Sequence, residues 1–178
     1  NDGFSTIEEL IAGTGVNDDQ DLPFLDITIE DFETGDFSKL PWQRHGDLTW
    51  TVTGQDAYAG LYAARSPALD NGQESRLEIN FFCKAGEISF NCSVDSQAES
   101  DTLRFYIDDV LMDEWSGSRP YTMAAYPVTD GMHTFAWVYA KDEAGSSGSD
   151  SARLDDIVFP GKVDSDNDGM ADMWEYVH

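Results

Sequence analysis

The sequence predicts an all-β protein, an antiparallel sandwich of two sheets with short calcium-loop and helix segments at both termini. Two observations carry this prediction. From Leu25 onward, apolar residues alternate with polar ones in many short runs, and no convincing helical pattern occurs between residues 24 and 160. Alternation with a period of two is typical of half-buried strands, and many short strands with polar turns indicate a sandwich. A calcium-loop pattern also occupies the last part of the chain.

The length of 178 residues fits one domain with flanking segments. We expect residues 1–22 to be the C-terminal half of a calcium-binding repeat plus a linker. Residues 23–162 are expected to form the sandwich, and residues 163–178 the start of a second, EF-hand-like calcium repeat. A net charge of −25 argues against nucleic-acid binding, because a phosphate backbone would be repelled. No apolar run approaches the ~20 residues that cross a bilayer, so direct membrane insertion is not expected.

About nine strands are expected within the sandwich. Trp50 and Trp137 fall on alternating apolar faces and are predicted to lie in the core. Asp108 and Asp109 are predicted to form a tight turn. The clearest strand candidates are residues 25–29, 48–52, 77–83, 88–94, 103–107, 135–139 and 152–159, with shorter ones at 61–64 and 121–128.

Two cysteines lie on successive strand candidates joined by a short turn. If these strands form a hairpin, Cys83 faces Ile88, and Cys92 lies opposite Ile79. The two sulfur atoms are then too far apart for a disulfide. We therefore predict two free thiols.

The segment from Asp164 to Glu175 fits the twelve-position calcium loop at every defined position. Calcium prefers six to eight oxygen ligands. The pattern supplies carboxylates at positions 1, 3, 5 and 9, a backbone carbonyl at position 7 and a bidentate carboxylate at position 12. In order, these ligands are Asp164, Asp166, Asp168, Asp172, Met170 and Glu175.

Half of the same loop opens the chain. Asp2, Phe4 and Glu9 occupy the positions that Asp168, Met170 and Glu175 occupy at the other end. A short helix is expected over residues 5–11. The two ends resemble thrombospondin type 3 calcium repeats of bacteria, a resemblance that implies calcium-stiffened linkers in a secreted or surface protein.

A second resemblance covers residues 25–161. Its ordered elements include the stretches 32–37, 60–66, 101–108, 133–139 and 154–157. This order is similar to the jelly-roll modules of bacterial secreted proteins, including MAM-like and gingipain-type cleaved-adhesin domains. The resemblance implies a two-sheet jelly roll, no catalysis, and often a structural calcium ion that joins the first and last strands.

The residues also suggest that metal. Glu33 closes the first predicted strand, and Asp155 and Asp156 lie within the last one. Carboxylates among apolar neighbours need a partner, and these strands are neighbours in a jelly roll. By alternation either aspartate is a candidate ligand, whereas the resemblance favours Asp155. The alternative is that these are ordinary surface or capping acids.

Ligand binding by this fold would use exposed aromatic rings. Trp42 follows a proline in a loop, and Trp115 precedes Ser116 and Gly117; Arg119 and Tyr121 lie close in sequence. These four residues are the candidate carbohydrate-binding residues. Packing of the two tryptophans against loops is the alternative.

No catalytic motif supports an enzyme: no nucleophile elbow, zinc-protease motif or phosphate loop occurs. The sequence therefore predicts a non-catalytic, calcium-binding adhesion or carbohydrate-binding module of a large secreted or surface bacterial protein. Its expected partners are calcium and a polysaccharide or a cell-surface glycan or protein. One alternative is a structural spacer in a repetitive adhesin. Another is an accessory domain of a secreted protease or polysaccharide-degrading enzyme.

Overall fold

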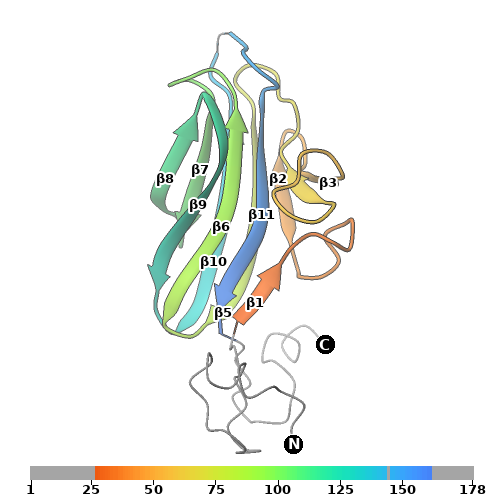
Figure 1. The fold of residues 1–178 in the computed structure, drawn as a ribbon. Coiled ribbons are helices and arrows are strands. Elements are labelled where there is room, and N and C mark those ends of the chain that lie inside the picture. Colours follow the sequence, from red (N-terminus) through yellow and green to blue (C-terminus); the bar gives the residue numbers. More distant parts are fainter. Residues whose placement is uncertain (1–26, 144, 162–178) are drawn as a thin grey trace, which may run out of the picture.

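The computed structural model describes residues 27–143 and 145–161, which form two antiparallel sheets packed face to face (Figure 1). The all-β sandwich predicted from the alternating pattern is confirmed. The described residues hold eleven strands and no helix, so none of them belongs to a helix that could cross a membrane.

Each sheet is assembled from strands that lie far apart in the sequence. The first sheet has the order β3-β4-β11-β6-β9, with β1 also paired to β11. The second sheet has the order β2-β5-β10-β7-β8. The strands of the first sheet are β1 (Ile27–Glu30), β3 (Thr51–Thr53), β4 (Ala63–Arg65), β6 (Gly86–Asp95), β9 (Ser118–Val128) and β11 (Ser151–Pro160). Those of the second are β2 (Gln43–Gly46), β5 (Glu74–Cys83), β7 (Thr102–Ile107), β8 (Val110–Ser116) and β10 (Gly131–Ala140).

The core lies between the two sheets and is rich in aromatic rings. Trp50 and Trp137 are fully buried, as the alternation predicted. Phe90 of the first sheet meets Phe105 of the second edge to face, with ring centroids 4.7 Å apart. Contacts of this geometry add to the hydrophobic stabilisation that burial itself provides.

The cysteines are free and buried, as predicted, but the hairpin behind that prediction is wrong. Strand β5 pairs with β10 and β2, whereas β6 pairs with β11 and β9. The short link from Cys83 to Gly86 therefore crosses from one sheet to the other. Sequence proximity favoured a hairpin, but the two strands lie in different sheets, each of which covers the apolar face of the other.

Two strands were missed. β2 is entirely exposed and polar, so it has no apolar alternation to detect. β8 begins with three consecutive apolar residues, Val110, Leu111 and Met112, so it lacks the alternation that marks a strand; all three are exposed, and the register with β7 shifts nearby. The turn between β7 and β8 is the predicted one, and both Asp108 and Asp109 adopt positive φ. Aspartate tolerates this conformation better than most residues.

The edge of β11 holds a gap between two partner strands. β4 pairs with β11 as far as Leu154, and β1 pairs with it from Ile157 onward, along with a register shift against β6. Asp155 and Asp156 lie in between, and Asp156 has a φ of 46°. The first and last strands are therefore neighbours, as the sequence suggested, and the break between β4 and β1 positions the site described next.

Candidate functional site

The loop between β3 and β4, residues 54–62, is anchored at this gap by Asp155. Its Oδ2 atom accepts hydrogen bonds from the backbone nitrogens of Tyr58, at 2.8 Å, and Ala59, at 3.1 Å. Its Oδ1 atom accepts one from the nitrogen of Asp156, at 2.9 Å. The carboxyl group is fully buried. Burial raises the pKa of Asp155 above its ordinary value, while the three N–H donors act in the opposite direction.

Glu33 provides a second anchor for the same loop. Its Oε1 atom accepts hydrogen bonds from the backbone nitrogens of Leu61, at 2.7 Å, and Tyr62, at 2.9 Å. Gly60 lies against this carboxylate with a φ of 61°, and a β-carbon there would stand 2.4 Å from Glu33 Oε1. The close approach therefore requires glycine at position 60.

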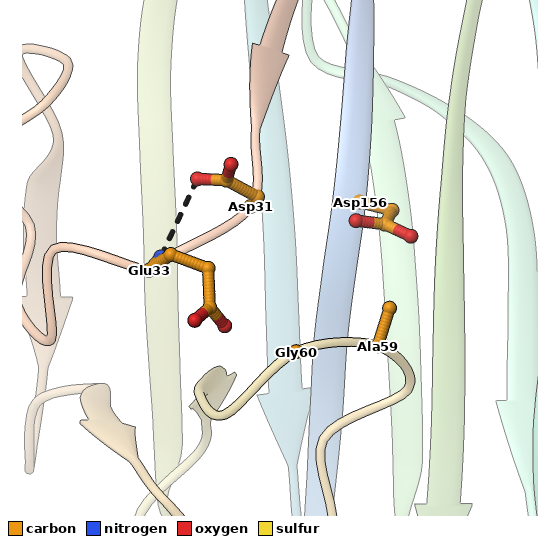
Figure 2. Close-up of a pocket in the computed structure, with 5 residues that line it drawn as sticks. All are labelled: Asp31, Glu33, Ala59, Gly60 and Asp156. Carbon is orange, nitrogen blue, oxygen red and sulfur yellow. Dashed lines mark hydrogen bonds between the residues drawn. The ribbon is translucent and has the colours of Figure 1, made fainter.

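An acidic pocket opens beside these anchors. Figure 2 shows Asp31 and Glu33 on the segment that follows β1, Asp156 on β11, and the backbone of Ala59 and Gly60 passing next to them. Asp31 Oδ1 accepts a hydrogen bond from Lys39 Nζ at 2.6 Å, so one of the three carboxylates already has a cationic partner. We call these five lining residues the acidic pocket.

The donor set of the acidic pocket suits a hard cation, because the side chains offer only carboxylate oxygens. Its arrangement is looser than a metal site: within residues 27–143 and 145–161, no group of three or more His, Cys, Asp or Glu side chains is placed to hold an ion. Asp155 bonds backbone N–H groups, whereas Asp156 lines the pocket. A calcium ion shared by Glu33 with Asp155 or Asp156 stays a prediction.

The other predicted calcium ligands lie outside the described residues. They are Asp2, Phe4 and Glu9 at the N-terminal side, and Asp164, Asp166, Asp168, Met170, Asp172 and Glu175 at the C-terminal side. They too stay predictions.

The structure favours the alternative of packing for Trp115 and, in part, for Trp42, while their role in ligand binding stays a prediction. Trp115 is only 9% exposed and belongs to the core, 6.0 Å from the Phe90 ring. Trp42 is partly buried and contacts Trp137, while its Nε1 donates a hydrogen bond to the buried carboxylate of Glu30 at 2.9 Å. Trp115 thus lies in the core and Trp42 packs against it, and each ring buries apolar area there.

Tyr121, by contrast, does form part of an exposed group. Its ring lies 5.5 Å from the ring of Tyr58, which is 53% exposed. The Tyr121 hydroxyl donates to the backbone carbonyl of Asp56 at 2.9 Å. Arg153 donates from a terminal guanidinium nitrogen to Asp56 Oδ2, also at 2.9 Å. We call Tyr58, Tyr121, Asp56 and Arg153 the tyrosine platform.

Arg119 is exposed and its Nε donates to the carbonyl of Ser116. Sequence reasoning missed Tyr58, Asp56 and Arg153. No local signal marks them, because Tyr58 reaches Tyr121 only through the loop that Asp155 holds.

Comparison with solved structures places this fold among known modules. A cleaved adhesin domain of Lys-gingipain from Porphyromonas gingivalis superposes with a TM-score of 0.59 at 11% identity, over 77% of this chain and 99% of that one. TmCBM61, solved in complex with beta-1,4-galactotriose, superposes with a TM-score of 0.54 at 21% identity, over 73% and 94%.

The C-terminal family 22 carbohydrate binding module of Xyn10B from Clostridium thermocellum superposes with a TM-score of 0.53 at 14% identity, over 78% and 96%. No family model matches the sequence, and no curated protein matches it. At these identities the comparisons establish a fold shared with carbohydrate-binding modules and adhesin domains. The resemblance to cleaved-adhesin domains is thus confirmed for the fold.

Proposed function

We propose that this chain is a non-catalytic carbohydrate-binding module of a secreted or surface protein. The observation that carries the proposal is the tyrosine platform: the exposed ring of Tyr58 against the half-buried ring of Tyr121, beside an Arg–Asp pair, on a fold shared with carbohydrate-binding modules. Solved relatives of this fold are described as binding modules or adhesin domains, which supports binding rather than catalysis.

The platform offers the two kinds of contact that sugars need. The apolar face of a pyranose ring packs against an aromatic ring, and Tyr58 keeps half of its surface free for such contact. Asp56, whose side chain is 73% exposed, offers carboxylate acceptors for hydroxyl groups, and the largely buried Arg153 holds it in place. The net charge of −25 disfavours polyanions. The ligand class that fits is therefore a neutral polysaccharide.

The test is a titration with neutral oligosaccharides and polysaccharides. β-1,4-Galactan and xylan fragments are suitable first probes, followed by a glycan array. Tyr58→Ala should abolish binding without lowering the melting temperature, because the ring is exposed. Tyr106→Ala is the matched control, since Tyr106 is a half-exposed tyrosine on β7 of the other sheet. Equal binding by the wild type and Tyr58→Ala would reject the platform, and no binding to any glycan would favour a structural spacer.

Calcium belongs to the same proposal. The twelve-position pattern from Asp164 to Glu175 supports one ion, and the oxygen-only acidic pocket supports a second near Glu33. Titration of the chelator-stripped protein with calcium should give at least one site. Glu175→Gln should remove the site formed by the loop from Asp164 to Glu175. A titration without heat and without a shift in melting temperature would reject calcium.

A further inference from the structure

A buried lysine, Lys141, directly follows β10 and lies between two aspartates. Ala140, the last residue of β10, pairs with Thr102, the first residue of β7. Lys141 and Asp101 are therefore the next pair across these two antiparallel strands. The side chain of Lys141 is 1% exposed and that of Asp101 is fully buried. The second carboxylate, Asp150, comes from the loop before β11 and is 17% exposed.

The Lys141 amine lies closer to Asp150 than to Asp101. Lys141 Nζ lies 2.8 Å from Asp150 Oδ2 and 3.5 Å from Asp101 Oδ2. Asp101 Oδ1 accepts a hydrogen bond from the backbone nitrogen of Asp142 at 3.1 Å. Asp101 Oδ2, in contrast, has no hydrogen-bond partner within the described part of the chain. One carboxyl oxygen is thus held by a donor, and the other faces an amine.

We propose that Lys141 and Asp101 join in an intramolecular isopeptide bond. Asp150 takes a proton from the Lys141 ammonium group and passes it to Oδ2 of Asp101, and the neutral Nζ then attacks Cγ of the resulting carboxylic acid. The tetrahedral intermediate places negative charge on Oδ1, where the Asp142 N–H stabilises it. Oδ2 leaves as water with two protons that the ammonium group supplies, one of them through Asp150. An ammonium and a carboxylate become one amide and one water, so atoms and charge balance without any oxidant or co-reactant.

The surroundings favour this condensation. Folding holds the amine beside the carboxyl group, which replaces a bimolecular encounter with an intramolecular one. Burial keeps bulk water away from an amide that water would otherwise hydrolyse. Burial alone would lower the pKa of Lys141, but the hydrogen bond to Asp150 and the charges of both aspartates raise it above its ordinary value. The same hydrogen bond holds the ammonium group beside the carboxylate that accepts its proton.

The intact mass of the purified full chain tests the proposal directly. A completed bond lowers it by about 18 Da, the mass of one water, relative to the sequence. Trypsin then leaves Lys141 uncut, so residues 85–104 and 105–153 appear as one branched species. Succinimide formation at an Asp–Gly pair also removes one water, but it does not join these peptides. Lys141→Arg should restore the sequence mass.

Asp150→Asn is the informative variant, because it keeps both reacting groups and removes the proton carrier. It should retain the native circular dichroism spectrum and show the full sequence mass, whereas Asp150→Glu should again lose one water. Folded wild-type protein that keeps the full sequence mass after prolonged incubation would overturn the proposal and leave an ion pair. Glycan titrations do not enter this test, so it is independent of the proposed function.

Discussion

The buried carboxylate of Asp155 lies 2.8 Å from the backbone nitrogen of Tyr58, although 97 residues separate them in the sequence. This bond ties the loop that carries the exposed ring to the middle of β11. The bond lies at the short stretch of β11 that pairs with neither β4 nor β1. The acidic pocket and the tyrosine platform both use residues of this loop.

Asp155→Asn should therefore loosen the loop while the sandwich stays folded. An amide cannot accept with both of its heteroatoms, so at least one of the three N–H donors loses its acceptor. We expect a loss of about 1–2 kcal/mol in the free energy of unfolding. Urea denaturation measures this loss, and hydrogen exchange at residues 58 and 59 should accelerate. Asp156→Asn is the matched neighbour, and it should stay within about 0.5 kcal/mol of the wild type. Equal losses in both variants would contradict the anchor.

Glu33→Gln separates the loop anchor from a calcium ligand. The glutamine oxygen can still accept from the nitrogens of Leu61 and Tyr62, so the loop bonds survive. In chelator we expect almost no change in melting temperature. In calcium we expect a clear decrease, because an amide is a weaker calcium ligand than a carboxylate. Equal melting temperatures of variant and wild type in calcium would remove Glu33 from the ligand set.

Asp108 should contribute to stability with a defined dependence on pH. Partial burial would raise its pKa, but the bonds from the Thr134 nitrogen and the His133 ring hold the pKa below its ordinary value of 3.8. The folded state therefore favours the carboxylate. The contribution is present above the unfolded pKa and is lost as the pH falls through the lowered, folded pKa.

The Asp108→Asn variant should accordingly be less stable than the wild type at neutral pH, by no more than about 1 kcal/mol because the group is half exposed. The difference should shrink as the pH is lowered toward about 2. Denaturation series at several pH values measure it. A difference that grows as the pH falls would contradict the prediction.

Trp115→Ala should act through the core. The indole is 9% exposed and packs on Phe90, so its removal leaves a cavity that should cost about 3–5 kcal/mol. Any loss of glycan binding should then follow the fraction of unfolded protein. Thermal melts and titrations below the melting temperature check this together. A stable Trp115→Ala variant that no longer binds glycan would return Trp115 to the ligand site.

Prediction from the sequence succeeded where local patterning is strong. The alternation at Leu77, Ile79 and Phe81 predicted a strand and its buried face, and Asp108 and Asp109 predicted a turn. It failed at β2, which has no apolar face, and at the pairing of β5 with β6. Which strands pair depends on how the whole chain is divided between the two sheets, and no residue in the short link between β5 and β6 indicates that division.

The sequence by itself determined the all-β class, the buried tryptophans at 50 and 137, and the candidate calcium ligands, because periodicity and ligand spacing are properties of neighbouring residues. Only the tertiary structure decided that Trp115 belongs to the core, that Trp42 packs against it, and that Tyr58 meets Tyr121. It alone placed Lys141 between Asp101 and Asp150. These contacts join residues that are far apart in the sequence. They form because large rings are stabilised by burial and because buried polar groups need hydrogen-bond or ionic partners.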